Sequence, residues 1–209
     1  MFGTHDLVMF VIAGLLLNIT PGADTLYIVG RSASQGARAG AVAALGIGAG
    51  CFVHVSAAAL GLSALLSASA LGFAIVKYVG AAYLFYLGVS MIVRHARPTD
   101  AAKTLAAEAL SRVFWGGFLT NALNPKVALF FLAFLPQFID AASPSKGLGM
   151  LFLGVVFTFN ATLWNLFVAW SSATVSSRFK ASPAIAAWLN RACGSLFLYF
   201  SLKLVRSNA

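Results

Sequence analysis

The chain has 209 residues, of which 60% are hydrophobic and only 9% are charged. Because a soluble domain usually carries about 25% charged residues, this composition excludes an ordinary water-soluble fold and favours a protein that crosses a lipid bilayer. The formal net charge of +9 comes mostly from basic residues between apolar stretches, without the basic stripe of a nucleic-acid-binding surface, so we expect no nucleic-acid partner.

Six apolar stretches predict transmembrane helices, since a span needs about 20 mostly apolar residues. In chain order they cover roughly residues 7–30, 41–66, 71–93, 113–135, 147–175 and 183–205. No stretch shows the alternation of a strand, so the expected fold is an all-α membrane protein. The N-terminal stretch lacks the basic region of a signal peptide, and we expect it to be a retained helix.

The first apolar stretch is interrupted by Pro21-Gly22, with Asn18 and Thr20 before the pair and Asp24 after it. Proline breaks helical hydrogen bonding, and threonine is a residue type that caps a new helix, so we expect the span to stop and restart here. Gly22 adds backbone freedom at the break. The restarted helix offers free N–H groups to a substrate carboxylate; the alternative is a packed kink that contacts no ligand.

Asp24 is the only carboxylate predicted well inside a span. A charge at that depth costs at least about 2.5 kcal/mol on insertion scales, so such a residue usually faces a polar interior. One interpretation is that Asp24 receives a substrate ammonium or carries a coupling proton. The other is that it caps a helix close to the membrane interface.

The second stretch places His54 near its middle. This histidine is either part of a proton relay or substrate contact, or a neutral side chain bonded to a backbone carbonyl between helices. The Gly46-xxx-Gly50 pattern permits close helix approach. Cys51 and Cys193 lie far apart without the spacing of a disulfide framework or a metal site, so we expect no metal and no cofactor.

The fourth stretch carries a second break at Asn124-Pro125, followed by Lys126. Asparagine is a good N-cap and proline suits the first helical position, so a helix should restart here too. Lys126 could pair with a carboxylate, from a substrate or from Asp24. Four further amides are candidates either for the same cavity or for hydrogen bonds between helices: Asn18, Asn121, Asn160 and Asn165.

The two halves of the chain are alike. The third stretch, from Lys77 to Tyr86, and the sixth, from Arg191 to Phe200, have a basic residue, a glycine and aromatic residues at the same spacing. Three spans per repeat require the second repeat to enter the membrane inverted. We therefore expect one transmembrane domain over residues 1–209, with repeat 1 at about 5–94, a loop at 95–112 and repeat 2 at about 113–206.

Basic residues between the spans predict the orientation. Eight lie on one side: Arg31, Arg38, Arg94, Arg97, Lys103, Arg112, Arg178 and Lys180. Three lie on the other: Lys146, Lys203 and Arg206. The positive-inside rule places the eight in the cytoplasm, so both termini should lie outside.

Several motifs resemble a known family over nearly the whole chain. They are Asn18-Ile-Thr-Pro-Gly-Ala-Asp24, Gln35-Gly36, Ala44-Leu-Gly-Ile-Gly48, Gly80-Ala-Ala-Tyr-Leu and Gly117-Phe-Leu-Thr-Asn-Ala-Leu-Asn-Pro-Lys-Val-Ala-Leu-Phe-Phe131. Together they resemble the LysE/RhtB family of bacterial amino-acid exporters, although Ala23 stands where Pro-Gly-Pro-Asp is usual. The resemblance implies six helices in the bacterial inner membrane, and export of amino acids or derivatives driven by the proton motive force. It leaves the substrate open.

Two other classes are open alternatives. A membrane thiol-electron carrier would place cysteines beside helix-breaking prolines, whereas Cys51 and Cys193 lie away from Pro21 and Pro125. A passive channel or structural membrane protein would show the same spans. No hydrolase, metalloprotease or nucleotide-binding motif is present, so we expect no enzyme. The expected partners are an amino-acid substrate, protons and the bilayer; association into a homo-oligomer is open.

The charge distribution makes the topology testable. Reporter fusions after Val93 and at the C-terminus should report a cytoplasmic and an external location respectively, because the eight basic residues are retained inside. A cytoplasmic C-terminus would reverse this orientation.

Overall fold

The computed structural model describes residues 2–62, 70–93, 107–140 and 142–174, with seven single positions near the C-terminus at 191, 195, 198, 199, 201, 202 and 205. These residues form seven α-helices, one π-helical segment and one 3-10 turn, and none of them belongs to a β-strand. The predicted all-α class is therefore confirmed for the described part of the chain.

The helices follow the predicted spans. The first span comprises α1 (Leu7–Ile19) and α2 (Ala23–Gln35), and the second comprises α3 (Ala37–Ser56) and the π-helical segment η1 (Ala57–Leu62). The third is α5 (Ala70–Val93). The fourth comprises α6 (Leu110–Ala122), α7 (Pro125–Ala133) and the 3-10 turn η2 (Leu135–Phe138), and the fifth is α8 (Lys146–Thr174).

Two to four of these elements qualify as membrane spans by length and apolar composition. The continuous ones are Ala37–Gly61 and Lys146–Thr174. The broken pairs α1–α2, bent by 54°, and α6–α7 with η2, bent by 46°, qualify when each pair is counted as one span. The predicted sixth span lies outside the described residues, apart from single positions, as do residues 95–106 of the predicted loop at 95–112. The six-span repeat therefore stays a prediction.

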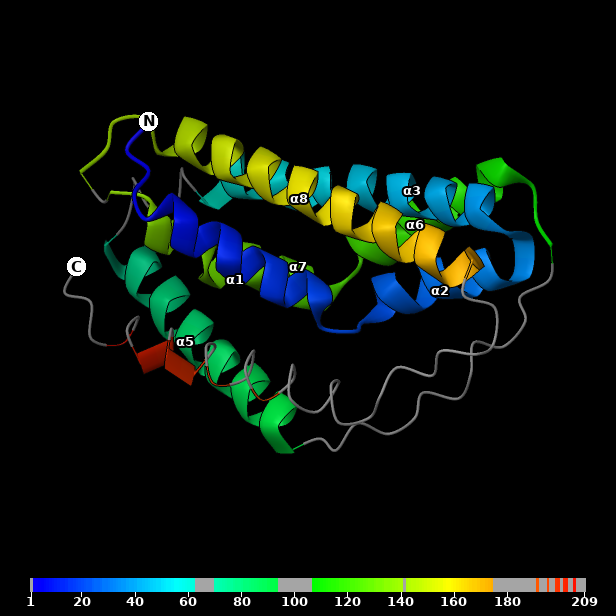
Figure 1. The fold of residues 1–209 in the computed structure, drawn as a ribbon. Helices are drawn as coiled ribbons and strands as arrows, with labels where there is room; N and C mark the ends of the chain where they lie inside the picture. Colours follow the sequence, from blue (N-terminus) through cyan, green and yellow to red (C-terminus); the bar gives the residue numbers. More distant parts are fainter. Residues whose placement is uncertain are drawn as a thin grey trace.

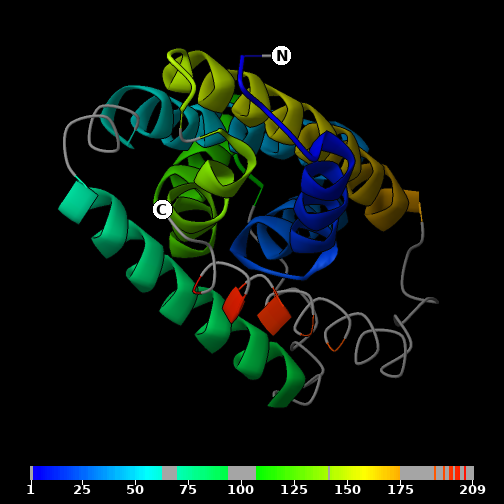
Figure 2. The ribbon, with the colours of Figure 1, turned by 90° about the vertical axis from the view of Figure 1, so that its left-hand side faces the viewer.

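The described helices pack into one bundle (Figure 1). Helix α3 packs against α6, α8 and α2, while α1 runs along α8. Helix α5 lies at the edge of the bundle, where it contacts α7 (Figure 2). The hydroxyl of Ser201 donates to the carbonyl of Ala81 in α5 at 2.9 Å, which places that part of the C-terminal segment beside α5.

Two apolar cores lie along the length of the bundle. The first joins α1, α7 and α8 through aromatic residues, including Phe10, Phe130 and Phe157. The second joins α2, α3, α6 and α8 through residues such as Ile28 and Ile47. Each broken pair therefore contributes one half to each core, whereas α3 and α8 contribute to both.

Helices α3 and α6 meet in backbone contact at three glycines. A methyl group at Gly46 would collide with the carbonyl oxygen of Phe114, and one at Gly50 with that of Phe118. A methyl group at Gly117 would come within 2.6 Å of the Ala43 carbonyl oxygen. The close approach predicted from the Gly46-xxx-Gly50 pattern is confirmed.

The position of Arg31 differs from the one predicted from the sequence. Arg31 was expected in the connection between the first two spans, but it lies buried inside α2, and Gly36 alone separates α2 from α3. Its guanidinium Nη2 lies 2.8 Å from Glu108 Oε1, and its Nη1 donates to Gln35 Oε1 at 3.2 Å. The prediction failed because α2 continues as a helix beyond the apolar stretch, and Glu108 compensates the buried charge.

The close contact between α3 and α6 leads to a prediction about the stability of the protein. Gly50→Ala should lower the free energy of unfolding by about 1–3 kcal/mol, because its methyl group has no space beside the Phe118 carbonyl. Chemical denaturation in detergent micelles measures this change. Gly61→Ala is the matched control, since a methyl group there meets no atom within 4 Å. Equal stability of the two variants would contradict the close packing.

Candidate functional site

At the first break α1 ends at Ile19, with Thr20 as its C-cap, and the chain restarts as α2 at Ala23. The Thr20 hydroxyl donates back to the carbonyl of Leu16 at 2.8 Å, and its backbone N–H donates to the same oxygen at 3.2 Å. The N-cap of α2 is Gly22, without a side-chain cap. The prediction that Thr20 caps the new helix is therefore wrong, because Pro21 and Gly22 separate it from the first helical residue.

The second break forms as predicted. Asn124 is the N-cap of α7, and Pro125 occupies the first helical turn. The side-chain oxygen of Asn124 accepts a hydrogen bond from the backbone N–H of Lys126 at 3.0 Å. This satisfies one of the N–H groups that every helix start leaves without an intrahelical partner.

Lys126 connects the second break to the first. Its ammonium donates to the backbone carbonyls of Leu17 at 2.8 Å and Thr20 at 2.9 Å, at the C-terminal end of α1. A cation at this end is stabilised by the negative pole of the helix and by carbonyls that lack intrahelical donors. The sequence predicted a carboxylate partner for Lys126, and these carbonyls were not foreseen.

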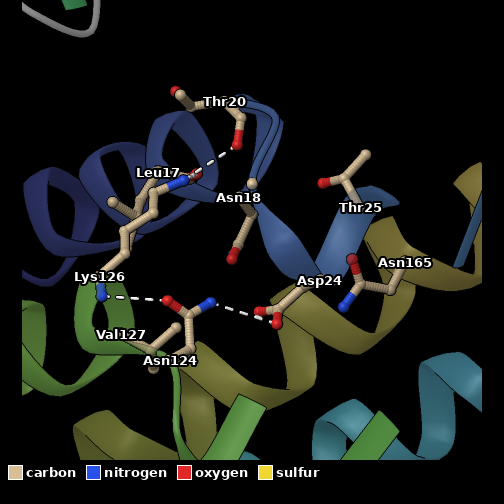
Figure 3. Close-up of a pocket in the computed structure, with 10 residues that line it drawn as sticks. Leu17, Asn18, Thr20, Asp24, Thr25, Asn124, Lys126, Val127 and Asn165 are labelled. Atoms are coloured by element: carbon tan, nitrogen blue, oxygen red, sulfur yellow. Dashed lines mark hydrogen bonds between the residues drawn. The ribbon is translucent and has the colours of Figure 1, made fainter. Parts of the chain in front are cut away.

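Asp24 connects the breaks in the opposite direction. It lies in the first turn of α2, as predicted, and is partly buried. Its Oδ2 accepts from the side-chain amide of Asn121 at 2.8 Å, and its Oδ1 accepts from that of Asn124 at 3.2 Å. Figure 3 shows Asn124 between Asp24 and Lys126. Both carboxylate oxygens are therefore held by amides of the other broken helix.

His54 is connected to the Asp24 carboxylate through Asn121. It is 8% exposed, and its Nε2 lies 2.9 Å from the backbone oxygen of Asn121, whose side chain binds Asp24. Because a carbonyl oxygen only accepts hydrogen bonds, Nε2 is the protonated nitrogen. Of the two interpretations of His54, the bond to a backbone carbonyl between helices is the one seen in the structure. A role in proton transfer stays a prediction.

A pocket opens between the two breaks, with an empty volume of about 340 Å³ that includes solvent at its mouth. Its lining comprises Leu17, Asn18, Thr20, Gly22, Asp24, Thr25, Asn124, Lys126, Val127 and Asn165 (Figure 3). Six of the ten predicted site residues line it. Pro21, His54, Asn121 and Pro125 do not belong to the lining, although Asn121 binds a residue that does.

The pocket also contains residues that sequence reasoning treated differently. The sequence analysis did not predict Leu17, Thr25 and Val127 as pocket residues. Each is the chain neighbour of a predicted site residue, and this closeness was the only signal in the sequence that pointed to them. Asn165 was a candidate for the cavity and lines it, whereas Asn160 on the same helix is not part of the lining.

Comparison with known proteins identifies the family of this chain. The profile of the LysE type translocator family matches residues 15–208. The chain belongs to the LysE type translocator family. The resemblance inferred from the two break motifs is thereby confirmed.

Relatives of this LysE-type chain cover almost its whole length. It is 32% identical to a membrane protein of Pseudomonas aeruginosa, over 97% of this chain and 95% of the relative. It is 29% identical to a leucine efflux protein of an Enterobacter species, over 97% of this chain and 96% of the relative. A membrane protein of Bacillus subtilis is 32% identical over 79% of this chain and 82% of its own length. No solved structure gives a significant match.

The connection between the breaks predicts an effect on stability. Lys126→Met should lower the free energy of unfolding by about 1–3 kcal/mol, because the carbonyls of Leu17 and Thr20 lose their charged donor. Denaturation in detergent micelles measures this loss. Lys146→Met is the control, since the Lys146 ammonium forms no hydrogen bond or ion pair with the described residues. An unchanged Lys126→Met protein would show that these bonds contribute nothing.

Proposed function

We propose that this LysE-type protein is a secondary transporter that exports amino acids or close derivatives from the cytoplasm, and that the substrate binds in the pocket between the two breaks. The observation that carries the proposal is Asp24, an intramembrane carboxylate that lines the pocket and is held by amides of the second broken helix. The similarity to leucine efflux proteins supports an amino acid as the substrate class.

Asp24 is suited to bind the ammonium group of an amino acid. Each of its oxygens accepts one amide hydrogen, and an ionised carboxylate has about four acceptor positions, so capacity remains on both oxygens. The two amides hold the carboxylate in place before the substrate arrives. A bound ammonium would compensate a charge that is costly in a low-dielectric site.

The proposed driving force is the proton motive force. In this scheme Asp24 takes a proton when the substrate ammonium is absent, so that substrate and proton alternate on one carboxylate. His54 is the second candidate for proton handling, because the single residue Asn121 connects it to Asp24. The proposal also places the protein in the bacterial inner membrane with both termini outside, as one domain of two inverted repeats.

The role of Asp24 is tested by its amide. Asp24→Asn keeps the shape of the side chain but removes the negative charge. Gradient-driven export should fall at least about 100-fold, because the variant can neither pair with the substrate ammonium nor carry the coupling proton. Proteoliposomes loaded with each amino acid, under an imposed proton gradient, measure the export rate. Asp6→Asn is the matched control, because Asp6 is an exposed carboxylate that pairs with His5.

Three results would count against this proposal. Export by Asp24→Asn at the wild-type rate would show that Asp24 is only a helix cap. Amino-acid movement that equilibrates but never proceeds uphill would identify a passive channel. A wild-type protein that moves no amino acid would reject the substrate class.

A further inference from the structure

One wall of the pocket carries polar groups that no described residue satisfies. Asn165, on α8, is 7% exposed and lines the pocket, yet its amide forms no hydrogen bond with any described residue. The hydroxyl of Thr25, which lines the same pocket, is likewise without a partner among the described residues. Because buried polar groups in proteins are almost always hydrogen-bonded, Asn165 indicates a bound species. The half-buried Thr25 hydroxyl lines the same pocket and can donate to that species.

The start of α2 adds donors to the same wall. The hydrogen bonding of α2 begins with the N–H of Leu26, which donates to the carbonyl of Gly22 at 3.0 Å. The N–H groups before it, from Ala23 to Thr25, precede this ladder, and Gly22 provides no side-chain cap. A helix start of this kind attracts anions, because its N–H groups and its dipole both favour negative charge.

The charged groups of the pocket divide it into two sides. The Asp24 carboxylate binds the amides of Asn121 and Asn124 on the side of the second break, and the Lys126 ammonium binds carbonyls of α1. Figure 3 shows Asn165 and Thr25 on the other side of Asp24 from Asn124 and Lys126. An α-amino acid carries its ammonium and its carboxylate on one carbon atom, so both groups can be bound here at once.

We infer that Asn165 and Thr25, together with the first turn of α2, form the subsite for the α-carboxylate of the exported amino acid. This inference rests on the proposed function and deepens it. The Asn165 amide and the Thr25 hydroxyl donate to the carboxylate oxygens, while Asp24 binds the ammonium. The transporter therefore selects substrates with a free α-carboxylate beside a free α-ammonium, and rejects amino-acid amides.

The test compares leucine with leucinamide, which keeps the ammonium and side chain but lacks the carboxylate. Wild-type full-length protein in proteoliposomes exports radiolabelled leucine, and unlabelled leucine or leucinamide competes. Leucinamide should compete at least about tenfold more weakly, because a lost hydrogen bond to a charged group lowers affinity by about 10- to 100-fold. If the proteoliposome export assay identifies another amino acid as the substrate, that amino acid and its amide replace leucine and leucinamide.

The variants separate carboxylate binding from packing. Asn165→Ala and Thr25→Val should each raise KM for leucine about tenfold or more, with little change in the maximal rate, and should bring leucine and leucinamide closer together as competitors. Asn160→Ala is the matched control, because Asn160 lies on the same helix but outside the pocket lining. Two variants on different helices keep the test valid if one of them fails to fold.

The outcomes distinguish the inference from the function it rests on. If wild-type protein exports the amino acid but both variants behave like Asn160→Ala, the carboxylate subsite is wrong and the exporter proposal stands. The same holds if the variants weaken leucine and leucinamide equally. If wild-type protein neither binds nor exports any amino acid, both proposals are overturned.

Discussion

The structure depends on one constraint: backbone N–H and C=O groups that a helix break exposes inside a membrane must find partners within the protein. Here much of that requirement is met across the two breaks. The carbonyls that end α1 are bound by Lys126, which belongs to α7. The first turn of α2 presents Asp24, which binds amides of the second break. Each broken helix therefore supplies hydrogen-bond partners to the other.

This arrangement explains why the pocket lies where it does. The aromatic core of α1 and α7 and the smaller core of α2 and α6 are apolar on both sides of the breaks, while α3 and α8 run through both cores. The polar side chains that line the pocket therefore lie at the level at which the helices are interrupted. Asn165 of α8 and His54 of α3 are buried polar residues that the two continuous helices contribute near this level.

Sequence patterns predict the helices and the positions of both breaks because proline, glycine and apolar length act locally. Asn124 as a cap is equally local, since its partner is the N–H two residues away. Two of the errors concern contacts between distant residues: Lys126 binds carbonyls more than 100 residues away, and Arg31 is buried against Glu108. Neither partner can be read from spacing, because each depends on how the helices pack. The third error is local, since the Thr20 hydroxyl binds the Leu16 carbonyl four residues back and so closes α1 instead of capping α2.

The glycine contact between α3 and α6 has a mechanical consequence. A carbonyl oxygen of α6 rests on Gly46 and another on Gly50, so sliding by one residue would place a larger side chain under each oxygen. Resistance to shear of this kind makes α3 and α6 a single rigid unit. Helix α7 follows the 46° bend, after Leu123 and Asn124. A change of backbone angle at residues 123–124 would therefore move α7 without disturbing the contact between α3 and α6.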